Sequence, residues 1–87
     1  MTKPYLVGIL PAAQKDLKKI GEPHLSRIRG LILGLAIQPR PPRVKKLAGG
    51  SLAYRIRCGV YRILYEINDQ VRTVEVFRVA HRREAYR

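Results

Sequence analysis

The chain has 87 residues, and its 18 lysines and arginines against six acidic residues give a formal net charge of +12. A domain of this size buries only roughly 60–65% of the surface of its unfolded chain, so a deep, substrate-enclosing pocket is not expected. The charge predicts a polyanionic partner bound on an open surface or in a shallow groove, and a basic surface without any partner is the alternative.

The first half of the chain predicts a strand and then two helices. The apolar stretch from Pro4 to Leu10 predicts the strand. Pro11 suits the first turn of a helix, and the segment AAQKDLKKI after it places its apolar residues on one face. A second helix is expected to open at Pro23 and must end before Pro39, because the PRPP run cannot continue it. The two helices would therefore form a hairpin.

The second half predicts an antiparallel sheet. The basic stretch PRPPRVKKLAGG leads into three segments rich in valine, isoleucine and tyrosine, and their short connections at Cys58-Gly59 and Asn68-Asp69 predict a meander. Residues 1–87 are thus expected to form a single α+β domain of order β-α-α-β-β-β, with a two-helix hairpin packed on one face of the sheet. The predicted strands are residues 53–58, 60–67 and 71–79, followed by a polar tail over residues 80–87.

The segment RIRCGVYR, from Arg55 to Arg62, gathers arginines where strand pairing needs no charge. With a two-residue loop at the Cys-Gly pair, Arg55, Arg57 and Arg62 share one face of the sheet, and Arg55 lies directly opposite Arg62. Like charges placed directly opposite are destabilising, so we predict a solvent-facing surface that binds phosphate. The alternative is an ordinary surface ion pair, because a two-residue loop at the next turn would place Glu75 opposite Arg62.

The tail segment RVAHRREAYR adds a second basic cluster. His81 is one of two histidines, and imidazole is the usual proton-transfer group near neutral pH, although a lone surface histidine is usually inert. Tyr86 follows, where it can cap the sheet or stack on a nucleic-acid base. His24, in the helical half, is expected to have no chemical role.

Conventional catalytic and metal-binding motifs are missing from the sequence. It has no paired carboxylates, no phosphate-cradling glycine loop and no metal-ligand spacing, and Cys58 alone can form neither an intramolecular disulfide nor a cysteine-based zinc site. An enzyme with arginine, histidine and tyrosine, and with no metal or cofactor, can still cleave RNA, because the RNA 2′-hydroxyl is itself the nucleophile. No signal peptide or membrane span is expected, which favours the cytoplasm.

Three segments carry a resemblance that covers nearly the whole chain: KKLAGG, YRIRCGVYRILYEI and VFRVAHRREAY. The chain resembles the RelE/ParE toxin superfamily of bacterial toxin–antitoxin systems, and more narrowly the RelE-type mRNA interferases. The resemblance implies a RelE-like fold and the toxin of a type II module. It also implies a metal-independent endoribonuclease that cuts mRNA in the ribosomal A site by 2′-hydroxyl attack and so inhibits translation.

The resemblance further implies roles for four residues. Arg62 of YRILY matches the family's phosphate-stabilising arginine, and Arg82 of AHRRE matches a second essential arginine near the leaving group. Tyr86 matches a C-terminal tyrosine thought to orient or deprotonate the 2′-hydroxyl, and His81 matches a position proposed as general acid in some relatives. The sequence leaves open which of Tyr86 and His81 is the base and which is the acid.

Arg55 and Arg57 depart from the family pattern, because the best-known members have lysines at these two positions. Arginine binds phosphate but does not exchange protons, so proton transfer would fall to Tyr86 and His81. Further RNA or phosphate contacts are expected from Lys45, Lys46, Arg78 and Arg83.

The implied partners are a RelB-like antitoxin, the small ribosomal subunit with its A-site mRNA, and operator DNA only through the antitoxin complex. No membrane partner is expected. ParE-type members of the superfamily share the fold but poison DNA gyrase, which is the alternative function. The two functions predict different geometry, because a nuclease requires His81, Arg82 and Tyr86 to converge on Arg62 around a phosphate-sized site.

Overall fold

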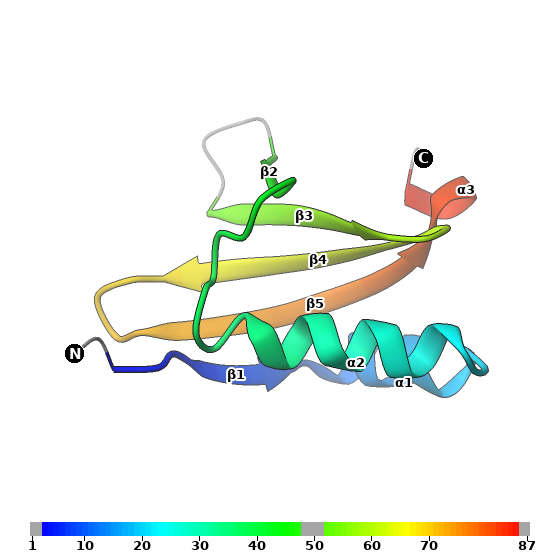
Figure 1. Ribbon diagram of the computed structural model, residues 1–87, viewed down its shortest axis with the longest axis horizontal. Helices are drawn as coiled ribbons and strands as arrows, with labels where there is room; N and C mark the ends of the chain where they lie inside the picture. The colour runs from blue at the N-terminus through cyan, green and yellow to red at the C-terminus, as the bar shows by residue number, and fades with distance from the viewer. Residues whose placement is uncertain (1–2, 48–51, 86–87) are drawn as a thin grey trace.

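The computed structural model describes residues 3–47 and 52–85, which form a twisted sheet with two helices packed against it (Figure 1). Pro11 opens the first helix as predicted, and the second helix ends before Pro39. Two short elements were not predicted, β2 in the basic stretch and α3 in the tail. The elements in chain order are β1 (Leu6–Ile9), α1 (Pro11–Lys18), α2 (His24–Gly34), β2 (Lys45–Lys46), β3 (Ala53–Cys58), β4 (Tyr61–Asn68), β5 (Thr73–His81) and α3 (Arg82–Ala85).

The sheet has five strands in the order β1-β5-β4-β3-β2. The predicted meander of β3, β4 and β5 is confirmed, and β2 adds antiparallel pairs at one edge. The sheet is mixed rather than antiparallel, because β1 runs parallel to β5 with Leu6 opposite Thr73. No short turn joins β1 to β5, so turn residues carry no information about the relative direction of these two strands.

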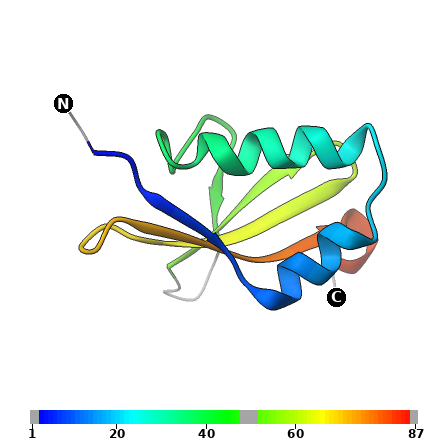
Figure 2. The same cartoon turned by 90° about the horizontal axis from the view of Figure 1, so that it is seen from below.

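The helices and one face of the sheet enclose a common apolar core. Figure 2 shows α2 running along this face, and α1 packs against β5. Ile28 of α2 and Tyr65 of β4 are completely buried, as are alternate residues on either side of Tyr65 along its strand. Among the described residues, no helix is both long and apolar enough to span a membrane. The opposite face of the sheet is left for polar side chains.

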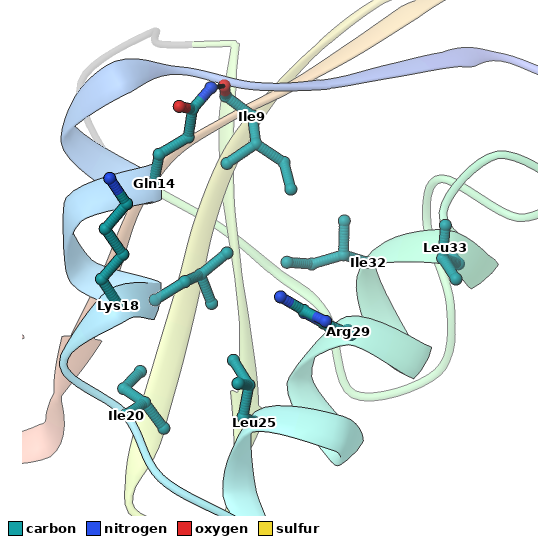
Figure 3. Close-up of a pocket in the computed structure, with 9 residues that line it drawn as sticks. Ile9, Gln14, Lys18, Ile20, Leu25, Arg29, Ile32 and Leu33 are labelled. Atoms are coloured by element: carbon teal, nitrogen blue, oxygen red, sulfur yellow. Dashed lines mark hydrogen bonds between the residues drawn. The ribbon is translucent and has the colours of Figure 1, made fainter.

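A groove of about 560 Å³ lies between α1 and α2 (Figure 3). Leucines and isoleucines form most of its wall, and Leu33 of α2 lines it while remaining 72% exposed. Lys18 from α1 and Arg29 from α2 also line it. The groove therefore combines apolar walls with two cations, and we call it the helix groove.

The turn between β3 and β4 lies one residue later than predicted. Gly59 and Val60 form it, and Cys58 pairs with Tyr61. Gly59 has a φ of +61°, a left-handed conformation that glycine adopts without steric cost and that tight hairpin turns require. The prediction placed the glycine second in the loop, whereas it is first.

The connection between β4 and β5 is also longer than predicted. It runs over residues 69–72 rather than two residues, and a bulge in the pairing of the two strands shifts the register again. Glu75 consequently lies opposite Glu66, while Ala80 lies opposite Arg62. The alternative of a surface pair between Arg62 and Glu75 is therefore wrong.

Asp69 in this connection joins three segments at the end of the sheet away from α3 (Figure 1). Its carboxylate accepts hydrogen bonds from the Arg40 guanidinium at 2.8 and 3.2 Å and from the Tyr5 hydroxyl at 2.5 Å. Arg40 also donates from Nε to the Tyr54 hydroxyl at 3.0 Å. These bonds tie the N-terminal segment and the segment after α2 to the β4–β5 connection.

Asp69→Asn is expected to lose less folding stability than the wild type as the pH falls. The hydrogen bonds from Arg40 and then Tyr5 lower the pKa of Asp69 from 3.8 to about 2. A carboxyl with a lowered folded-state pKa contributes stability above its unfolded pKa, and this contribution is lost as the pH falls from about 4 toward 2. Urea unfolding across this window should show the wild type losing more stability than the variant. Parallel curves would contradict this account of Asp69.

Candidate functional site

Four arginines from three elements line a cavity of about 510 Å³ where the β3–β4 turn meets α3 (Figure 1). Arg57 comes from β3, Arg62 from β4, and Arg82 and Arg83 from α3, with Gly59 of the turn completing the wall. None of the described residues that line it is acidic. A concave site walled by cations attracts anions, and the planar guanidinium fork matches the oxygens of a phosphate. We call this cavity the arginine pocket.

Arg57 and Arg62 are direct cross-strand partners in the wall of this pocket. The prediction that Arg55 lies opposite Arg62 is wrong by two residues, and Arg55 lies opposite Leu64. The predicted shared face is confirmed, because a shift of two residues preserves the alternation of side chains along a strand. Arg62 is only 4% exposed, which contradicts the predicted solvent-facing position. A buried guanidinium therefore lies opposite an exposed one, an arrangement that an anion between them would stabilise.

Two hydrogen bonds hold the start of α3, one to the β3–β4 turn and one to the side chain of His81. The N–H of Arg82 donates to the carbonyl oxygen of Val60 at 2.6 Å. The N–H of Arg83 donates to the Nδ1 atom of His81, directly before the helix, at 3.3 Å. Arg82 and Arg83 are thus brought from the end of the chain to the wall that Arg62 occupies.

Two further predicted phosphate-binding residues extend the positive face beyond the pocket. Lys45 of β2 pairs with Arg55 of β3, so both share the face of Arg57 and Arg62. Lys46 pairs instead with Tyr54 and belongs to the other face. The basic surface on the pocket's side therefore runs from β2 across β3 toward α3.

Arg78 is not brought into the arginine pocket. Its Nε donates to Oδ2 of Asp16 at 2.8 Å, and the same oxygen accepts from the Val79 N–H at 2.9 Å. Asp16 lies on α1, so this pair draws Arg78 toward the helices and balances its charge. The sequence held no local sign of this contact, because the two residues are 62 positions apart.

His81 also lies away from the pocket. It lines a separate cavity of about 280 Å³ together with Tyr61 and Arg78, and it is absent from the described wall of the arginine pocket. The predicted role of Tyr86 concerns a residue outside the described part of the chain. Of the four residues expected to be catalytic, the structure therefore brings Arg62 and Arg82 together.

Sequence reasoning missed two backbone features of the site. The Val60 carbonyl anchors α3, and the positive φ of Gly59 shapes the wall beside it. Only the glycine left a signal in the sequence. Within the described residues, no group of three or more histidine, cysteine or acidic side chains is arranged to hold a metal ion.

Comparison with known proteins shows the family to which the chain belongs. A family model described as the ParE toxin of the type II toxin-antitoxin system parDE matches residues 7–86. The chain belongs to the RelE/ParE toxin superfamily. This toxin is 36% identical over 86 residues to toxin RelG of Mycobacterium tuberculosis, covering 97% of the chain and 98% of RelG. It is 30% identical to the putative toxin RelE1 of Methanocaldococcus jannaschii, covering 95% of the chain and 96% of that relative.

Solved structures of RelE toxins share the fold. The toxin aligns with the archaeal RelE–RelB complex of Pyrococcus horikoshii with a TM-score of 0.82 at 30% identity, covering 91% of this chain and 96% of that one. It aligns with the RelBE2 toxin-antitoxin complex of Mycobacterium tuberculosis with a TM-score of 0.79 at 32% identity, covering 90% and 98%. Both structures are complexes of a toxin with its antitoxin.

Proposed function

We propose that this toxin is a ribosome-dependent endoribonuclease that cuts mRNA in the A site and so inhibits translation. The arginine pocket carries the proposal, because four guanidinium groups around one concavity match the charge that a phosphodiester develops during cleavage. The RelG and RelE1 relatives, each similar over nearly its whole length, support the RelE type of activity.

The proposed reaction uses the RNA, the side chains and solvent water. The 2′-oxygen attacks the adjacent phosphorus while its proton passes to a base. The bond from phosphorus to the 5′-oxygen breaks as that oxygen takes a proton from water, which leaves a 2′,3′-cyclic phosphate. Arg62 and Arg82 would stabilise the added negative charge on the phosphoryl oxygens. Because arginine stays protonated, we assign the base to Tyr86.

The proposed partners follow from the same surfaces and from the related complexes. Ribosomal RNA and mRNA suit the basic face that Arg57, Arg55 and Lys45 form beside the pocket. A RelB-like antitoxin suits the helix groove, whose apolar wall and two cations fit an amphipathic segment carrying carboxylates. Operator DNA would be bound through the antitoxin, and the toxin would act in the cytoplasm, where ribosomes translate.

Poisoning of DNA gyrase is the alternative function, and the matching family model is described as a ParE toxin. The named relatives and related structures are RelE and RelG toxins. His81 does not converge on Arg62 as predicted for a nuclease, but the buried Arg62 facing Arg57 beside Arg82 suits a bound phosphodiester. We therefore favour RNA cleavage, and trapped gyrase–DNA breaks in the presence of the toxin would favour the alternative.

Arg82→Ala is expected to lose roughly 10²–10³-fold in inhibition of cell-free protein synthesis, the usual effect of removing one group that stabilises a charged transition state. Arg78→Ala is the matched control, because it removes the same charge from a residue paired with Asp16 outside the pocket. The control should keep most of its inhibition. Equal losses in both variants would show that net charge, rather than the pocket, carries the activity.

A further inference from the structure

We propose that His81 is a positioning residue that holds α3 and its arginines at the arginine pocket, and that it does not transfer a proton to the RNA. This inference rests on the proposed nuclease function for its consequence, but the contacts themselves are independent of it. They are the hydrogen bond that the Arg83 N–H donates to Nδ1, the packing of the ring against Tyr61, and the face of the sheet on which His81 lies.

The hydrogen bond makes His81 the cap of α3. The first N–H groups of a helix have no carbonyl partner within the helix, and a side-chain acceptor at the residue before it satisfies one of them. His81 is the last residue of β5, and its Nδ1 accepts the N–H of Arg83, the second residue of α3, at 3.3 Å. An imidazole nitrogen that accepts a hydrogen bond carries no proton, so the neutral ring holds its proton on Nε2.

The ring is held by aromatic contacts on the helix side of the sheet. Its centroid lies 5.6 Å from that of Tyr61 in an edge-to-face arrangement, with an angle of 83° between the planes. Tyr61 in turn lies 5.6 Å from the ring of His24. This packing fixes the orientation of the imidazole, and therefore the direction of the hydrogen bond to α3.

Strand register separates His81 from the phosphate site. His81 pairs with Tyr61, whereas Arg62 pairs with Ala80, and neighbouring residues along a strand point to opposite faces. His81 lines the cavity that contains Asp16, and it is absent from the described wall of the arginine pocket. A proton donor must come within hydrogen-bonding reach of the leaving 5′-oxygen, and the described wall of the arginine pocket does not include His81.

The consequence of the cap is the placement of two arginines. Arg82 and Arg83 follow His81 directly, and the N–H of Arg82 donates to the carbonyl oxygen of Val60 while the N–H of Arg83 donates to His81. Loss of the His81 bond would remove one of these two tethers of α3. The arginines would then occupy the pocket less of the time.

His81→Asn and His81→Phe separate positioning from proton transfer. The asparagine Oδ1 replaces Nδ1 as a cap but cannot exchange protons near neutrality, whereas phenylalanine keeps a ring against Tyr61 and has no acceptor. We expect His81→Asn to retain near wild-type RNA cleavage with an unchanged pH profile. We expect His81→Phe to weaken binding of an RNA with a non-cleavable 2′-O-methyl group by about fivefold, the population change that a lost cap typically produces.

Amide hydrogen exchange at Arg83 tests the cap without any cleavage. Exchange should be faster in His81→Phe and restored in His81→Asn, and the ¹⁵N shifts of the wild-type ring should report the Nε2–H tautomer. The proposal would be overturned if His81→Phe bound the non-cleavable RNA as tightly as the wild type does and His81→Asn lost its cleavage activity. If the wild type cuts no RNA, the proposed function fails, while the exchange and tautomer results still decide whether His81 caps α3.

Discussion

Arg62→Met is expected to slow RNA cleavage by roughly 10²–10³-fold while leaving the fold intact. Arg62 lies in the wall of the arginine pocket and directly opposite Arg57. Removing one group that stabilises the transition-state charge typically costs roughly 10²–10³-fold in rate. Methionine has a similar length and fills the buried volume without a charge.

The expected stability of the Arg62→Met variant follows from the burial of Arg62. A guanidinium that is 4% exposed has lost most of its hydration, and an apolar side chain of similar volume does not carry this cost of burying a charge. The substitution also removes the like charge opposite Arg57. Urea unfolding and single-turnover cleavage of ribosome-bound mRNA measure the two effects separately.

Arg55→Met is the matched control for Arg62→Met. Arg55 lies on the same face of the sheet but opposite Leu64, and it is absent from the described wall of the pocket. It should lose some RNA affinity through its charge and keep its cleavage rate at saturation. A fully active Arg62→Met variant would remove the pocket from the mechanism, and a variant that unfolds would show that Arg62 serves the fold.

Leu33→Glu is expected to release the toxin from its antitoxin while leaving its activity intact. Leu33 lines the helix groove, and its 72% exposure means that the substitution costs little in the free toxin. A carboxylate there would be buried under an apolar antitoxin segment and would repel the carboxylates that suit Lys18 and Arg29. The loss in affinity should reach about 30-fold or more, as for other residues at the centre of an interface.

Leu6→Glu provides the comparison for Leu33→Glu. Leu6 is 75% exposed on β1 and does not line the groove, so the two variants make the same chemical change at equal exposure. Titration of each toxin with the antitoxin, read by calorimetry and by recovery of cell-free protein synthesis, gives the affinities. Wild-type affinity in Leu33→Glu would place the antitoxin elsewhere on the toxin.

The face that Arg55, Arg57 and Arg62 share was predictable, because it depends only on the alternation of side chains. A loop shifted by one residue moved the cross-strand partner of Arg62 from Arg55 to Arg57 but kept all three on one face. The order of the main elements was predictable for a similar reason. Proline positions and apolar periodicity are local, so Pro11 and the run at Pro39 mark the helix limits whatever surrounds them.

Features set by distant contacts could not be predicted. The parallel pairing of β1 with β5 has no turn to mark it, and the pair between Arg78 and Asp16 joins residues at opposite ends of the chain. Arg62 shares the wall of the arginine pocket with Arg82 and Arg83 of α3, a helix that the tail sequence did not predict. His81 was expected at the phosphate because of the family resemblance, whereas its position at the end of β5 places it on the other face.

Primer extension on an mRNA held in translating ribosomes tests the central claim most directly. The wild-type toxin and Arg82→Ala would be compared on the same ribosomes, which a separate peptide-synthesis reaction shows to be active. The account predicts cuts confined to the A-site codon with the wild type and their loss in the variant. Uncut mRNA with the wild-type toxin on translating ribosomes would contradict it and would turn attention to DNA gyrase.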